Sequence, residues 1–277
     1  MKRRVDEVAA AHHVAPYVRI LVVLDGAERV ASLLDCIAGW VAPGAQVHVV
    51  GLARGARTAD ADHQAARRFC NRITLAATLD AACAALASRG IEADRELLEP
   101  HAGDPACTEA LALAIRRWGA DLTICTPGNR VVIEDGLHCP VLQIQAPYAR
   151  RCTAPPLRIF VASDGSSASA CAVREAARLA EPGATVRVAY LACDPVAAQH
   201  PEDFDAAVLN ARHDGETTAQ AIVEAATEWR ADLLVCGTRA GQPGGRWRYG
   251  SVAADVAQMT VLPLLLVPQT SGQSRLA

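Results

Sequence analysis

The stretch Trp118-Gly119-Ala120-Asp121-Leu122-Thr123-Ile124-Cys125 returns 111 residues later as Trp229-Arg230-Ala231-Asp232-Leu233-Leu234-Val235-Cys236. Two further echoes flank it in the same order. Residues 22–26 (VVLDG) resemble 161–165 (VASDG), and residues 139–144 (CPVLQI) resemble 262–267 (LPLLLV). Three echoes in one order indicate a duplicated domain. Their offsets differ, so the two copies have gained and lost residues since the duplication.

Length and composition agree with two domains. A chain of 277 residues, 51% hydrophobic and 21% charged, is long enough for two ordinary globular domains of roughly 100–150 residues each. The segment Thr153-Ala154-Pro155-Pro156 breaks the pattern of regular elements and is the natural linker. We therefore expect one domain over residues 16–150 and a second over residues 155–270.

Charge and hydropathy exclude several functional classes. The net charge of −3 offers no basic field for a nucleic acid. No apolar run reaches the roughly 20 residues of a membrane helix, and residues 1–15 lack the apolar core of a secretory signal. The ten cysteines form no Cys-x-x-Cys pair, and His138-Cys139 has no second pair nearby, so buried cysteines are expected rather than a metal site. The expected location is the cytoplasm.

Short apolar runs alternate with helical patterns throughout both copies. This alternation predicts parallel sheets covered by helices on both faces, an α/β fold. Strands are expected at 19–24, 46–52, 92–98, 121–126, 141–145, 157–163, 185–192, 206–211, 232–236 and 264–267. Helices are expected from Val30 to Trp40 and at 62–88, 107–118, 169–180, 217–229 and 251–259.

The two copies differ where a ligand would bind. The second copy is 28 residues shorter between its second and third strands but has 12 extra residues after its fourth strand. These lie in a glycine-rich stretch, 237–251, that ends in Gly250-Ser251 before a helix. Glycines let backbone N–H groups approach phosphate oxygens, and a helix N-terminus attracts anions. From composition alone, the favoured explanation is that Ser251 is a simple N-cap and the glycines form turns.

The C-terminal half resembles the universal stress protein family, and the whole chain resembles a tandem member of it. The matching motifs are Asp164-Gly165-Ser166 with Ser169, Asp214-Gly215-Glu216, and Ala231-Asp232-Leu233-Leu234-Val235-Cys236-Gly237. The family's signature of Gly, two residues, Gly, nine residues, Gly and Ser or Thr appears with Gly237, Ala240 and Gly250-Ser251. The resemblance is good over residues 157–268 and looser over 18–146.

That resemblance implies two doubly wound, five-stranded parallel sheets of strand order 3-2-1-4-5, as in adenine nucleotide alpha hydrolase-like folds. Strands one and four then lie side by side, with a crevice beyond their carboxyl ends. The implied ligand there is ATP, with or without Mg²⁺. Asp164 would face the adenine, although a turn that bonds its own backbone also explains it. The site residues implied are Asp164, Gly165, Ser166, Gly237, Thr238, Arg239, Ala240, Gly250, Ser251 and Val252.

Departures from the family pattern bear on affinity and on the first copy. Ala240 adds a methyl group where the family glycine approaches phosphate, and the shorter second copy lacks one wall of the pocket. Three arginines could pair with phosphates or lie in solvent: Arg239, Arg246 and Arg248. The aromatic residues of the loop, Trp247 and Tyr249, are expected to pack beneath it. In the first copy Asp25 is retained, but Ala27 replaces the serine and no Gly-x9-Gly-Ser follows Thr126. That copy is expected to be structural or to bind a partner.

The resulting hypothesis is a universal stress protein that binds ATP in its C-terminal domain and acts through conformation and partners. No Gly-x-Ser-x-Gly or Gly-x4-Gly-Lys motif marks an enzyme, so at most incidental ATPase activity is expected. A nucleotide-free scaffold of the same fold is the alternative. The last strands, 141–144 and 264–267, are apolar edges that need cover, and we expect them to meet in an intramolecular pseudo-dimer. Further dimerisation of the whole chain stays open.

Overall fold

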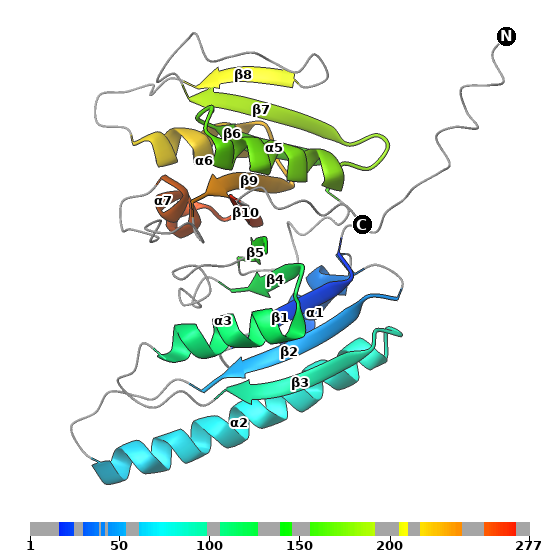
Figure 1. The fold of residues 1–277 in the computed structure, drawn as a ribbon, viewed down its shortest axis with the longest axis vertical. Helices are drawn as coiled ribbons and strands as arrows, with labels where there is room; N and C mark the ends of the chain where they lie inside the picture. Colours follow the sequence, from blue (N-terminus) through cyan, green and yellow to red (C-terminus); the bar gives the residue numbers. More distant parts are fainter. Residues whose placement is uncertain are drawn as a thin grey trace, which may run out of the picture.

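The computed structural model describes residues 17–24, 30–38, 40–41, 44–53, 61–98, 106–126, 139–145, 156–191, 205–209, 217–239 and 252–269. Their strands form one ten-stranded sheet in the order β3-β2-β1-β4-β5-β10-β9-β6-β7-β8. Figure 1 shows the halves end to end, with β5 and β10 in the middle. The strands are β1 (Arg19–Leu24), β2 (Gln46–Leu52), β3 (Ala93–Leu98), β4 (Leu122–Cys125), β5 (Val141–Gln143), β6 (Arg158–Ser163), β7 (Thr185–Leu191), β8 (Asp205–Leu209), β9 (Leu233–Thr238) and β10 (Leu264–Pro268).

Each half has the strand order 3-2-1-4-5 when its own strands are counted from its N-terminus. Within each half every pairing of neighbouring strands is parallel. Such a sheet needs crossover connections, which the alternating helices supply. The α/β fold with doubly wound parallel sheets, predicted from the sequence, is therefore confirmed.

The described helices cover both faces of the sheet. They are α1 (Val30–Ala38), α2 (Ala61–Ala87), α3 (Ala106–Trp118), α5 (Ser167–Leu179), α6 (Thr218–Glu228) and α7 (Val252–Met259). One apolar cluster holds buried residues of α1, α2 and α5, and a second holds residues of α3, α6 and α7. Both faces of the strands are thus buried, which explains why the strands read as continuous apolar runs rather than alternating ones.

The expected elements agree with the observed ones to within a few residues at each end. The largest difference in the first copy concerns Trp40, which was expected to lie in the first helix. That helix ends at Ala38, and Trp40 donates its backbone N–H to the carbonyl of Ile37 in a turn. The shortened connection of the second copy, residues 192–204, lies outside the described residues.

The two halves join through their last strands. β5 pairs antiparallel with β10, with Leu142 opposite Leu265 and Gln143 opposite Leu264. Every residue of both strands is buried. Leu142 and Leu265 belong to one apolar cluster that contains residues of both halves. The strands that sequence analysis placed at the sheet edges therefore pair with each other here, and the core is continuous across the junction.

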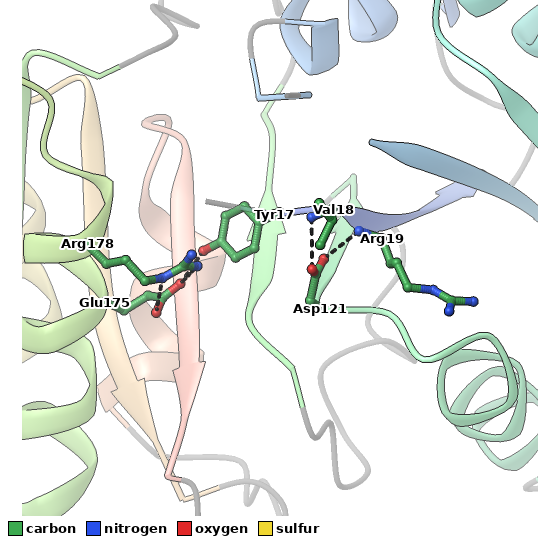
Figure 2. Close-up of polar contacts among 6 residues, drawn as sticks. All are labelled: Tyr17, Val18, Arg19, Asp121, Glu175 and Arg178. Carbon is green, nitrogen blue, oxygen red and sulfur yellow. Dashed lines mark hydrogen bonds and ion pairs between the residues drawn. The ribbon is translucent and has the colours of Figure 1, made fainter. Parts of the chain in front are cut away.

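The repeated Trp-x-Ala-Asp phrase has the same structural role in both copies. The carboxylate of Asp121 accepts hydrogen bonds from the backbone N–H groups of Val18 (2.9 Å) and Arg19 (3.0 Å), as Figure 2 shows. Asp232 likewise accepts from the N–H groups of Leu157 (3.1 Å) and Arg158 (2.9 Å). Each aspartate thus fixes the start of the first strand of its own half.

The tryptophan of each phrase packs under an arginine of that same first strand. The guanidinium carbon of Arg19 lies 4.9 Å from the ring centroid of Trp118, and that of Arg158 lies 4.5 Å from the ring of Trp229. These contacts sit at the amino ends of the strands. The phrase that reveals the duplication is therefore structural, and it lies at the opposite end of the sheet from the crevice expected to hold a ligand.

Candidate functional site

The site is set by a change of direction in the chain connections of the second half. Strands β6 and β9 are parallel neighbours, with Ile159 opposite Leu233 and Ala162 opposite Cys236. The helix after β6, α5, packs on one face of the sheet, and the helix after β9, α7, packs on the other. Connections that leave neighbouring strands toward opposite faces open a crevice at the carboxyl ends of those strands.

The turn from β6 into α5 lies at this end of the two strands. Gly165 has φ 75, a left-handed conformation that side chains disfavour, and it lets the chain reverse directly after Asp164. The carboxylate of Asp164 accepts a hydrogen bond from the N–H of Ser166 at 3.0 Å. Ser166 is the N-cap of α5, and its hydroxyl oxygen accepts from the N–H of Ser169 at 3.3 Å. Asp164 therefore has the local turn-forming role that sequence analysis weighed against adenine contact.

Asp164 is exposed in this turn. Partial burial of its carboxyl group raises its pKa, but hydrogen bonds from Ser166 and Ser169 lower it by more, so its pKa lies below the usual value. The group is consequently a carboxylate near neutral pH. A carboxylate directly after the carboxyl end of β6 can accept hydrogen bonds from an amino or hydroxyl group of a ligand.

A buried serine network supports the turn from below. The Ser163 hydroxyl donates to the Ser169 oxygen at 3.2 Å, and the Ser169 hydroxyl donates to the Ser166 carbonyl at 2.9 Å. The N–H of Gly165 donates to the Ser163 oxygen at 3.4 Å. Sequence analysis singled out Ser166 and Ser169 but not Ser163. The available signal was its place as the last residue of an apolar strand, where a polar side chain needs a partner.

Gly237 lets α5 approach β9 closely. A Cβ at this position would lie 2.3 Å from the carbonyl oxygen of Ala168 and 2.7 Å from the backbone nitrogen of Ser169. Those backbone atoms belong to the first turn of α5 and have no flexible end that could move aside. The glycine is thus required by helix-to-strand packing, a reason that needs no ligand.

The expected site residues fall into two groups. Asp164, Gly165, Ser166, Gly237, Thr238 and Arg239 lie at or next to the carboxyl ends of β6 and β9, and Val252 begins α7 with 39% of its surface exposed. Ala240, Gly250 and Ser251 lie outside the described residues, as do Arg246, Trp247, Arg248 and Tyr249. The structure therefore gathers the described members, and the phosphate-binding part of the expected site stays a prediction.

In the first copy, the expected loss of the ligand site rests on residues that the structure does not describe. Asp25, Ala27 and the stretch after Thr126 lie outside the described residues.

Five cysteines of the described part are buried as expected, but Cys70 is exposed and Cys83 partly so. Burial raises the pKa of Cys236 to about 12, so this thiol stays protonated. Within the described ranges no group of three or more His, Cys, Asp or Glu side chains could hold a metal ion, and no helix is long and apolar enough to cross a membrane.

Comparison with known proteins agrees with this geometry. The profile of the Universal stress protein family matches residues 208–268, which contain β9, α7 and β10. A universal stress protein from Archaeoglobus fulgidus DSM 4304 is similar over 91% of this chain and 98% of its own, with 17% identity and a TM-score of 0.64. A functionally unknown protein from Pseudomonas aeruginosa PAO1 is similar over 92% of this chain and 94% of its own, with 14% identity and a TM-score of 0.53.

No curated protein matches the chain in sequence. At these identities the two solved structures show the fold alone. The profile match is independent of them and confirms the recognition of the universal stress protein family, over part of the C-terminal half. The chain therefore shares the fold of these structures along nearly its whole length, and it has a family match over residues 208–268.

Proposed function

We propose that this chain binds an adenine nucleotide, ATP, at the carboxyl ends of β6 and β9. The observation that carries the proposal is the change of chain direction there: β6 and β9 are neighbours, and the helices that follow them pack on opposite faces of the sheet. Open α/β sheets bind their ligands at such a point. The family match over residues 208–268 includes the glycine-rich stretch that would complete the crevice. Both observations point to one place in the second half.

Each part of the site has a distinct role in this proposal. Asp164, held as a carboxylate, accepts a hydrogen bond on the adenine side of the ligand. The glycine-rich stretch and the N-terminus of α7, around Ser251 and Val252, hold the phosphates through backbone N–H groups. Arg239, exposed at the end of β9, supplies positive charge near them.

We further propose that the protein works by conformation and by binding partner proteins, in the cytoplasm, rather than by catalysis. Among the site residues that the structure describes, none forms a nucleophile–base pair, which covalent catalysis would need. Any ATP hydrolysis would then be slow and incidental. The first half, which lacks the glycine-rich stretch, serves as structural support or as a partner surface.

The alternative function is a nucleotide-free scaffold. Two observations favour it: Gly237 is required by helix packing, and Asp164 is engaged by the N–H of Ser166. Both residues would then belong to the fold and not to a site. The two functions differ in whether the purified chain binds ATP.

The deciding experiment is isothermal calorimetry of ATP with the intact chain, together with mass spectrometry of nucleotide released from the purified protein. Nucleotide binding predicts a saturable signal and a released adenine nucleotide, with affinity weakened by Asp164→Ala. Neither heat of binding nor released nucleotide would favour the scaffold. GTP and CTP titrations serve as controls for base recognition.

A further inference from the structure

Two helices of the second half begin at the proposed site. α5 starts from the N-cap Ser166, directly after the Asp164 turn. α7 starts at Val252, directly after Gly250-Ser251. Any change at the site that moves these first turns must also move the rest of each helix, because a short helix behaves as a rigid rod. Contacts that fix the C-terminal halves of α5 and α7 therefore also fix the position of the helix starts at the proposed site.

The far half of α5 is held by the first half of the chain. The hydroxyl of Tyr17 donates a hydrogen bond to the carboxylate of Glu175 at 2.5 Å, across 158 residues of sequence. Arg178 pairs with the same carboxylate at 2.5 Å, and its guanidinium carbon lies 4.6 Å from the centroid of the Tyr17 ring (Figure 2). Tyr17 is 1% exposed. It immediately precedes the segment that Asp121 anchors at the start of β1.

The phenol is suited to act as a permanent donor. Burial and the neighbouring Glu175 carboxylate raise the pKa of Tyr17 well above its usual value. The hydroxyl therefore stays protonated, and its hydrogen bond to a charged acceptor belongs to the stronger class. The contact joins an N-terminal segment to one named position on α5.

The last turn of α7 is also held by the first half. The side-chain amide of Gln143, on β5, donates to the carbonyl of Ala257 at 2.9 Å, and the amide of Gln145 reaches the same oxygen at 3.5 Å. Carbonyls in the last turn of a helix lack intrahelical partners, so this contact acts as a cap supplied by the other domain. Gln143 is 1% exposed, so the contact is sheltered from water.

We propose that the first half of the chain is a clamp that regulates the nucleotide site of the second half, with Tyr17 and Gln143 as positioning residues. The proposal rests on the proposed function, since the clamp holds the two helices that flank that site. Each clamp contact is at the end of its helix remote from the site. Ligand binding and clamp contacts then stabilise each other, because coupling between two sites is reciprocal.

Two variants release the clamp without touching the site. Tyr17→Phe keeps the ring over Arg178 but removes the hydrogen bond to Glu175, and Gln143→Leu removes the cap on Ala257. A hydrogen bond contributes roughly 0.5–1.5 kcal/mol, so we expect each variant to weaken ATP binding by about two- to tenfold. The double variant should weaken it by about the product of the two.

Arg117→Gln is the control for general stability. It removes the hydrogen bonds of Arg117 to Glu96, which join α3 to β3 within the first half. We expect it to lower stability toward urea while leaving ATP affinity unchanged. A role of Tyr17 in general stability alone would instead make both variants alike, and that result would overturn the clamp.

A ligand-free measurement separates failure of the clamp from failure of the proposed function. Hydrogen exchange of the amides of Ser169 and Ala170, in the first turn of α5, should speed up in Tyr17→Phe and not in Arg117→Gln. If the wild-type chain binds no ATP, the proposed function is wrong, and this exchange result still decides the clamp. Wild-type exchange rates in Tyr17→Phe would overturn it.

Discussion

Arg230 holds a left-handed backbone conformation, with φ 56, at the position where the first copy has Gly119 with φ 69. Both residues follow the helix that leads into the repeated aspartate. In both copies the next N–H bonds back to a helix carbonyl, from Ala120 to Ile115 and from Ala231 to Ala226, as in a Schellman motif. The second copy thus forms the same turn without the glycine that suits it.

Arg230→Gly is therefore expected to stabilise the protein. The left-handed conformation costs a side-chain-bearing residue about 1–2 kcal/mol, and the added freedom of glycine in the unfolded chain costs roughly 0.5–1 kcal/mol. The first term is larger, so we expect a net gain of about 0.5–1 kcal/mol in urea unfolding. Gly119→Ala is the reverse control, since its Cβ would meet only ordinary contacts with Arg19 and any loss would come from the backbone. A loss of stability in Arg230→Gly would contradict this account.

Asp164 predicts a dependence of stability on acid. Because its pKa is lower in the folded state than in the unfolded state, the carboxylate stabilises the fold. The contribution is fully present above the unfolded pKa of about 3.9 and is lost as pH falls through the lower folded pKa. We expect Asp164→Asn to show a flatter fall of the urea midpoint below about pH 4 than the wild type. An equally steep fall in the variant would show that other carboxylates account for it.

At the scale of elements, the approach of α5 to β9 is the tightest packing near the site. Gly237→Ala would place a Cβ 2.3 Å from the carbonyl of Ala168, so the helix start must shift. We expect a loss of about 1–3 kcal/mol in urea unfolding, as for other overpacked positions. Gly51→Ala is the control, because the Cβ of this strand glycine would meet only the side chains of Leu75 and Leu79, at 3.0 Å, and side chains can shift where a backbone cannot. An equal loss in Gly51→Ala would mean that the close approach of the α5 backbone is not the cause.

Sequence analysis succeeded where the signal is local and failed where it depends on how the halves dock. The apolar run at β6 and the helical spacing of α6 are each set by nearby residues, so their types and approximate limits could be predicted. The contact of Tyr17 with Glu175 could not, because it depends on the position of β5 against β10. The role of Asp121 at the start of β1 could have been inferred from the sequence, because both copies have the same Trp-x-x-Asp spacing.

At the scale of the whole molecule, the asymmetry of the copies predicts the number of ligands. Only the second half has the glycine-rich stretch, so we expect one ATP per chain in calorimetry and not two. Ala240→Gly should tighten binding by restoring close approach to phosphate. Gly250→Val should weaken it by one to two decades, equivalent to losing a charge-assisted hydrogen bond of roughly 1.5–3 kcal/mol. Two sites per chain, or unchanged affinity in Gly250→Val, would place the ligand elsewhere.

The continuous core predicts that the halves unfold together. Leu265 is fully buried on β10 and shares one apolar cluster with Leu142 and Ile20 of the first half. Leu265→Ala should cost about 2–5 kcal/mol, as large-to-small core changes do, and should speed hydrogen exchange in strands of both halves. Leu86→Ala, at the end of α2 and equally buried, is the matched control, and its effect should be concentrated in the first half. If Leu265→Ala sped exchange in the second half only, the pairing of β5 with β10 would join two independently unfolding domains. The first half could then not hold α5 and α7 in position as the clamp requires.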